Sequence, residues 1–89
     1  MICFIRSGGT GFVKIGYSAC PEKRLRQLQT GNPEVLWIEA LVDGDMELET
    51  SIHAQLQDRV KRGEWFEICQ EDLEQVIRSV RRKDEYEDE

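Results

Sequence analysis

The chain has 89 residues, of which 39% are hydrophobic and 34% charged, so it is long enough for one small domain and too short for two. This composition excludes a long disordered chain, and the longest apolar stretch, residues 1–5, is far shorter than the roughly 18 residues of a membrane span. The three cysteines are widely spaced and form no CxxC pair, which predicts neither a disulfide framework nor a zinc knuckle. Because no segment resembles a secretion signal, we expect a cytoplasmic protein without membrane contact.

The net charge of −6 hides a strong asymmetry along the chain. Residues 1–30 carry a net charge of +4, and residues 31–89 carry −10. The overall acidity argues against a nucleic-acid partner, whereas the basic first third would steer a phosphate to one side of the molecule; a solvated mixed surface is the alternative. Residues 83–89 hold five acids and one lysine, so we expect a disordered acidic tail after a single domain of residues 1–82.

The first half of the chain predicts a hairpin followed by a helix. Residues 2–5 and 12–17 are strand candidates, and residues 7–11 form a glycine-rich turn between them. A helix is predicted over residues 21–29, because Pro21 suits the first helical position and Glu22 complements the helix dipole. Gly31 is suited to a left-handed cap, and Pro33 cannot continue the helix.

The second half predicts one more strand and two helices. Residues 35–42 are rich in strand formers, residues 46–60 show apolar residues at helical spacing, and a final helix is indicated by the apolar series that ends at Val80. Between the helices, residues 63–66 are expected to return the chain to the sheet edge, with Trp65 and Phe66 as core aromatics or as a platform for bases. The order β-β-α-β-α-α predicts an α+β domain, in which helices cover a three-stranded sheet.

Two arginines of the first predicted helix face different directions. Leu25 and Leu28 define its apolar stripe, so that Arg24 falls near the edge of the stripe while Arg26 points away. An arginine held near the sheet presents a planar, always-charged fork to a phosphate; alternatively its stem only covers the core edge. Arg24 is therefore a candidate phosphate ligand.

Polar side chains on two other elements suit the same chemistry. Glu49 and His53 lie four residues apart on one face of the second predicted helix, with His53 further round toward solvent. A carboxylate near a sheet binds Mg²⁺ through oxygen, and the only histidine of the chain suits proton transfer, although solvated neighbours show the same spacing. Lys14 alternates with apolar strand residues and faces either the side of Arg24 or solvent.

Several motifs, in order over residues 1–80, resemble one known family. They are Phe12-Val13-Lys14-Ile15-Gly16-Tyr17-Ser18, Pro21-Glu22-Lys23-Arg24-Leu25, Leu28-Gln29-Thr30-Gly31-Asn32-Pro33, Leu48-Glu49-Thr50-Ser51-Ile52-His53 and Gly63-Glu64-Trp65-Phe66. The chain resembles the GIY-YIG nuclease superfamily, in particular the short branch whose second motif reads Lys-Ile-Gly. The resemblance implies a three-stranded antiparallel sheet flanked by helices, with an active site on one sheet face.

The resemblance also implies roles for individual residues. Arg24 matches an arginine that binds the scissile phosphate, and Glu49 matches the glutamate that holds a single divalent metal, Mg²⁺ or Mn²⁺. Lys14 occupies the place of the second-motif tyrosine. His53 and Tyr17 match polar positions near the site. Lys14, Arg24 and Arg26 are thus the expected nucleic-acid contacts.

The first motif departs from the family pattern. Met1-Ile2-Cys3 stands where the family has Gly-Ile-Tyr, so Cys3 replaces a tyrosine that activates or positions the attacking water. A buried thiol is a poorer hydrogen-bond donor than a phenol. Either Lys14 or Arg24 lowers the pKa of Cys3 to make it a thiolate, or the role is lost and passes to Lys14 or Tyr17.

These observations lead to three hypotheses. The first is a small metal-dependent DNA endonuclease that hydrolyses a phosphodiester bond by a one-metal mechanism. The second is a catalytically degenerate module of the same superfamily that binds nucleic acid or a protein partner without cleavage. The third is an interaction protein that forms a homodimer through an exposed sheet edge or its last helix. Sequence specificity would come from an oligomer or a partner protein, or would be absent, because no sequence-reading element is evident.

Overall fold

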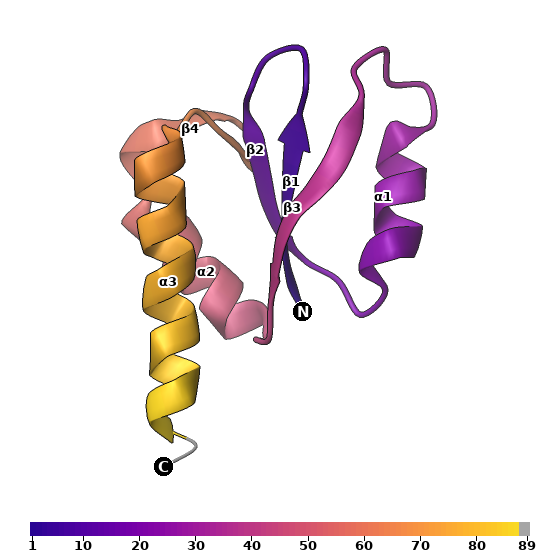
Figure 1. Cartoon of the computed structure of the whole chain (residues 1–89). Helices are drawn as coiled ribbons and strands as arrows, with labels where there is room; N and C mark the ends of the chain where they lie inside the picture. Colours follow the sequence, from indigo (N-terminus) through magenta and orange to yellow (C-terminus); the bar gives the residue numbers. More distant parts are fainter. Residues whose placement is uncertain (88–89) are drawn as a thin grey trace.

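The computed structural model of the protein describes residues 1–87, and of residues 82–87 the backbone alone. Within these residues a five-stranded antiparallel sheet with the order β3-β1-β2-β5-β4 is flanked by three helices (Figure 1). The elements are β1 (Ile2–Ser7), β2 (Val13–Tyr17), α1 (Pro21–Gln29), β3 (Leu36–Val42), α2 (Met46–Gln55), the 3₁₀ turn η1 (Gln57–Arg59), β4 (Val60–Arg62), β5 (Trp65–Phe66) and α3 (Gln70–Glu87). The α+β class and antiparallel sheet are confirmed, whereas the expected number of three strands is wrong.

The two additional strands, β4 and β5, follow the second helix: β4 begins at the last residue of the expected helix, and β5 lies in the segment that was expected to return the chain to the sheet edge. The predicted helix over residues 46–60 ends at Gln55, and the chain then forms η1 and the β4–β5 hairpin. Gly63 turns this hairpin in the left-handed region, with a φ of 58°, which glycine adopts without steric cost. Phe66 is 1% exposed and pairs with Val13 of β2, so burial of this ring favours the strand over a longer helix.

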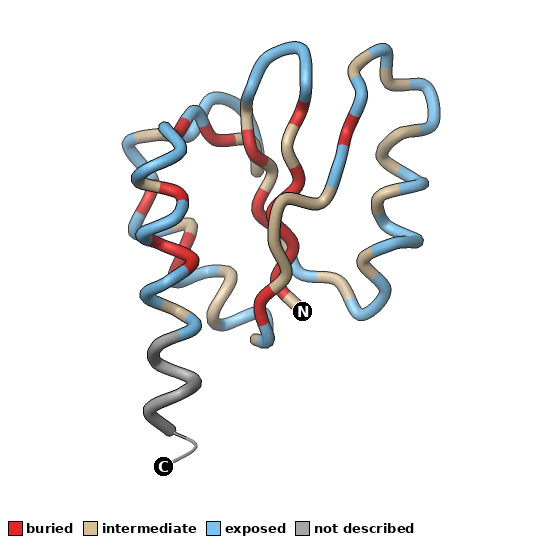
Figure 2. Tube along the Cα trace, in the orientation of Figure 1, coloured by how far each residue is buried: buried red, intermediate tan, exposed pale blue. Residues whose placement is uncertain are grey.

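The central strand β1 is buried on both faces of the sheet, because α2 and α3 cover one face and α1 partly covers the other, whereas β4 at the edge is exposed (Figure 2). Side chains of β1 alternate between the two cores: Ile2 and Phe4 pack with α2 and α3, whereas Cys3 and Ile5 pack with Leu25 and other residues of the α1 side. This explains why β1 reads as a continuous apolar run rather than an alternating strand.

Helix α1 begins and ends as its sequence predicts. Pro21 is its first residue, Glu22 lies in its first turn, and Gly31 follows its end with a φ of 75°. None of its residues is fully buried, and Leu25 and Leu28 are half-buried against the sheet. The helix therefore covers the sheet with few buried side chains and leaves its basic side chains exposed at the surface.

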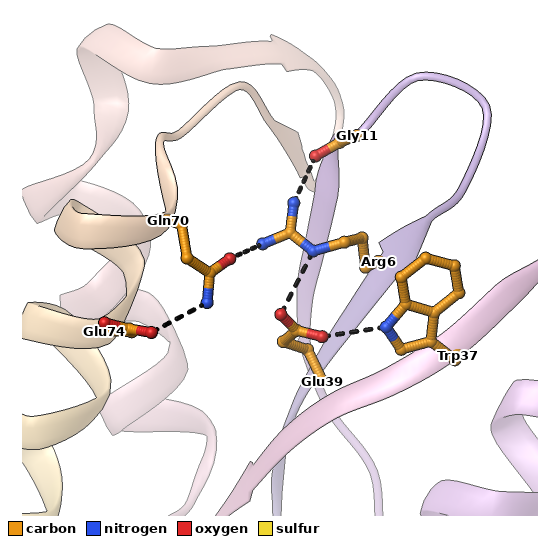
Figure 3. Close-up of polar contacts among 6 residues, drawn as sticks. All are labelled: Arg6, Gly11, Trp37, Glu39, Gln70 and Glu74. Carbon is orange, nitrogen blue, oxygen red and sulfur yellow. Dashed lines mark hydrogen bonds and ion pairs between the residues drawn. The ribbon is translucent and has the colours of Figure 1, made fainter.

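The side chain of Arg6 in β1 contacts three other parts of the fold: the turn after β1, the strand β3 and the start of α3 (Figure 3). Its guanidinium donates to the carbonyl of Gly11 at 2.8 Å and to Oε1 of Gln70 at 2.7 Å, and it pairs with Glu39 at 3.3 Å. The other carboxylate oxygen of Glu39 accepts from the indole of Trp37 at 2.9 Å. Because these partners occupy it, Arg6 serves the fold and is not available to a phosphate.

The last helix overlaps the segment that we expected to be a tail. Helix α3 includes residues 83–87, while residues 88–89 lie outside the described residues. The predicted domain end at residue 82 and the disorder of residues 83–89 stay predictions. No helix in the described part of the chain has the length and apolar character needed to cross a membrane.

Candidate active site

Two carboxylates and the only histidine converge beside the end of β2. Glu49 and His53 come from α2, and Glu64 comes from the turn that joins β4 to β5. Their candidate ligand atoms all lie within 4.8 Å of one another, and each residue is half-buried. The expected pair on α2 is thus joined by Glu64, to which the sequence analysis assigned no role. The feature of the sequence that could have indicated Glu64 is the Gly63-Glu64-Trp65-Phe66 segment, in which a charged residue follows a turn glycine.

Glu49 is held in place by the strand beside it. One of its carboxylate oxygens accepts a hydrogen bond from the backbone N–H of Tyr17 at 3.0 Å, and the side chain is 18% exposed. The helix that carries it is capped by Asp45, whose side chain accepts from the N–H of Leu48 at 3.0 Å. The cap and the strand contact together fix where the carboxylate points.

His53 does not face solvent as the helical spacing suggested. Its Nε2 lies 2.6 Å from the carbonyl oxygen of Ile15, and because a carbonyl only accepts, Nε2 must carry the proton. The ring also packs edge-on against Phe66, with centroids 5.0 Å apart. Nε2 is 3.8 Å from Glu49. His53 therefore joins α2 to β2, and its Nε2 has no lone pair to offer a metal.

Glu64, in the turn between β4 and β5, forms an ion pair with Lys14 of β2. The Lys14 ammonium lies 2.8 Å from Oε1 of Glu64 and 5.8 Å from the centre of the Trp65 ring. Burial raises the pKa of Glu64, but the hydrogen bond and charge of Lys14, with help from Glu49 and His53, outweigh burial and leave the pKa below its ordinary value. Glu64 is consequently ionised near neutral pH.

A narrow cleft between the sheet and α1 opens next to this cluster. It holds about 20 Å³ of open space and is lined by Lys14, Tyr17, Arg24, Glu64, Cys3, Ile5, Gly16, Ser18 and Leu28. The expected juxtaposition of Lys14 and Arg24 on one side of the sheet is therefore present. Arg24 is exposed. Arg26 is exposed on the same helix but does not line the cleft.

Cys3 lies at the floor of this cleft as a buried thiol. Its side chain is 2% exposed, and burial raises its pKa, although the N-terminal ammonium and Arg24 oppose that change. The thiol form is therefore favoured near neutral pH. This disfavours the thiolate alternative and leaves Tyr17, which is 41% exposed and lines the cleft, as a phenol beside the cluster.

The donor atoms fit a hard divalent cation. Glu49 and Glu64 each offer carboxylate oxygens, and Mg²⁺ characteristically takes one or two carboxylates and keeps several waters. The cysteines lie outside this cluster, so the donors do not resemble a structural zinc site. A cation between these carboxylates would face the cleft that Lys14 and Arg24 line, which is an arrangement suited to a phosphate.

Comparison with known proteins corrects the expected family. No curated protein and no solved structure matches the chain. No GIY-YIG family model matches it either, so the assignment to that superfamily is wrong. Short motifs that share residue types and order were not sufficient to separate the two families. The model that matches is that of the T5orf172 domain, over residues 1–81, and the chain therefore belongs to the T5orf172 domain family.

Proposed function

We propose that this protein is a small metal-dependent DNA endonuclease that hydrolyses a phosphodiester bond with one Mg²⁺ or Mn²⁺ ion. Membership of the T5orf172 family supports a nuclease-like or DNA-binding function. The observation that carries the finer proposal is the meeting of two carboxylates, Glu49 and Glu64, beside a cleft lined by Lys14 and Arg24. The net charge of −6 is compatible with DNA binding because the acidic residues lie mostly beyond residue 30.

The two carboxylates are the proposed metal ligands. Such an ion, when bound, neutralises charge on a phosphate oxygen and lowers the pKa of a bound water. Glu49 is oriented by the N–H of Tyr17, and Glu64 is kept ionised by Lys14. His53 holds α2 against β2 through its Nε2, and in this tautomer its Nδ1 keeps the lone pair.

The remaining residues have distinct roles toward the phosphate. Arg24, exposed at the cleft, donates to the phosphoryl oxygens and stabilises the charge that develops on them. Tyr17 and Lys14 are the groups placed to hydrogen-bond the attacking water, since the Nε2 of His53 is engaged with a carbonyl. Arg26 contributes to general attraction of the DNA backbone.

Metal binding and nicking are tested together. Wild type should nick supercoiled plasmid with Mn²⁺ and bind Mn²⁺ in calorimetric titration. Glu49→Gln should lose both, because an amide binds a hard cation much more weakly than a carboxylate. Glu47→Gln is the matched control, since Glu47 is exposed in the same first turn of α2, and it should behave as wild type. Unchanged Mn²⁺ affinity in Glu49→Gln, with circular dichroism showing an intact fold, would remove Glu49 from the site.

The second candidate function is binding of DNA, or of a protein partner, without cleavage. It is favoured by Cys3, whose buried thiol with a raised pKa offers no activated group at the floor of the cleft. The same assay separates the two functions. DNA binding without nicking in either Mg²⁺ or Mn²⁺ would select the binding module. A homodimer or a partner protein that supplies specificity remains a prediction, for which a concentration-dependent mass measurement is the direct test.

A further inference from the structure

A row of side chains extends from the cleft at β2 to β4, the strand at one edge of the sheet. Lys14 of β2 pairs with Trp65 of β5, and Trp65 pairs with Arg62 of β4, after a register shift in β4 between Val60 and Arg62. Residues directly opposite each other in antiparallel strands project from the same face of the sheet. The side chains of Lys14, Trp65 and Arg62 therefore form a row across three strands, on the face that α1 partly covers.

Helix α1 covers only one half of this face. Its leucines pack against Cys3, Ile5 and Leu36 of β1 and β3, whereas β4 is the strand at the opposite edge of the sheet (Figure 1). Arg62 is exposed at that open end. The row therefore begins with Lys14 at the cleft and ends with the exposed side chain of Arg62, which α1 does not cover.

Arg62 differs from the neighbouring lysines in that it forms no ion pair with a carboxylate in the described part of the chain. Lys14 is paired with Glu64 at 2.8 Å and Lys61 with Glu67 at 2.9 Å. Among the ion pairs of the described residues, none involves Arg62 or Arg24. Arg24 is on α1 and lines the cleft together with Glu64, whereas Arg62 is on the β4–β5 hairpin, two residues before Glu64, and does not line the cleft. An extended anion that leaves the cleft along the hairpin would meet Arg62 after Arg24.

We propose that Arg62 binds a backbone phosphate of the DNA strand that occupies the cleft, at a different phosphate from the one held by Arg24. The strands of Lys14 and Arg62 are two positions apart in the sheet, which corresponds to about 10 Å at the usual strand spacing. Arg62 is therefore beside the cleft and outside its lining, which suits a phosphate further along the strand than the one in the cleft. The inference rests on the proposed function, because it assumes that the cleft receives DNA.

The test uses the full chain and a fluorescein-labelled DNA duplex in EDTA, so that binding is measured without cleavage. Anisotropy titrations over a range of salt concentrations give the slope of log K against log [salt]. Arg62→Ala should weaken binding and reduce the slope by about 0.9, the value for one phosphate contact, whereas Arg62→Lys should keep the slope. Arg78→Ala removes the same charge from the groove between α3 and β3, on the other face of the sheet, and should leave the slope unchanged.

The outcomes separate this inference from the proposed function. A wild-type slope in Arg62→Ala, or an equal loss in Arg78→Ala, would overturn the Arg62 contact even if the protein nicks plasmid. A reduced slope specific to Arg62→Ala supports the contact even if no nicking occurs with Mn²⁺, in which case the endonuclease proposal fails. Absence of any DNA binding by the wild type would overturn both.

Discussion

Removal of the Lys14 charge should cost stability in a way that depends on pH. Lys14→Met keeps most of the aliphatic stem and removes the ammonium that lies 2.8 Å from Glu64. The side chains are 13% and 38% exposed, so the pair lies between a surface pair, worth about 0–1 kcal/mol, and a buried pair, whose disruption costs about 3–5 kcal/mol. Because Glu64 is partly solvated, screening reduces the effect, and we expect a loss of about 1–2 kcal/mol near neutral pH.

The direction of the pH dependence follows from the lowered pKa of Glu64. Burial acts to raise this pKa, but Lys14 is the main cause of its net displacement below the ordinary value of 4.5. A carboxylate with a depressed folded-state pKa stabilises the fold fully above its unfolded pKa, and this contribution disappears as pH falls through the folded-state pKa. The cost of Lys14→Met should therefore be largest above about pH 5 and shrink in more acidic solution.

Urea unfolding of the wild type and Lys14→Met at about pH 7 and at about pH 3.5 tests this prediction. Lys61→Met is the matched control: its pair with Glu67 has side chains 49% and 60% exposed, so the expected change is below about 0.5 kcal/mol. A double-mutant cycle with Glu64→Gln isolates the coupling between the two partners. The same cost at both pH values, or no coupling in the cycle, would refute the electrostatic reasoning.

Three further predictions concern the cleft. Arg24→Ala should reduce nicking by about 100-fold or more, whereas Arg26→Ala should mainly weaken DNA association and its salt dependence; equal effects in the nicking assay would mean that the cleft does not hold the phosphate. Cys3→Tyr should destabilise the protein by about 1–3 kcal/mol in urea unfolding, because the cleft beside this buried residue is too small for a phenol ring; an unchanged midpoint would show that the strand has room. His53→Phe should cost about 1–3 kcal/mol by leaving the Ile15 carbonyl without its donor, yet affect Mn²⁺ affinity much less than Glu49→Gln does; an equal loss of affinity in calorimetry would make His53 a ligand.

Local signals in the sequence were sufficient for several parts of the fold. Pro21 and Gly31 mark the ends of α1 because each restricts or permits backbone angles on its own, without help from distant residues. The alternation around Lys14 predicted the strand β2 and the face on which that lysine lies. The same local reasoning placed Arg24 near the sheet, where it lines the cleft with Lys14.

Long-range pairing decided what local signals could not. Residues 56–60 continue the helical apolar spacing of α2, but the chain forms η1 and starts β4 there, because burial of Phe66 against the core and its pairing with β2 favour the β4–β5 hairpin. That hairpin brings Glu64 within 4.8 Å of Glu49 and His53, although it lies 15 residues from Glu49 in the chain. The packing of α2 on β2 likewise brings His53 to the Ile15 carbonyl, which turns an apparently solvated histidine into a hydrogen-bond donor within the fold. The sequence by itself determined the α+β class, the strands β1, β2 and β3 and the helix α1, and it offered Lys14 and Arg24 as candidates for the basic side of the cleft. The strands β4 and β5 and the acidic side of the cleft depend on which strands meet, and only the tertiary structure decides that.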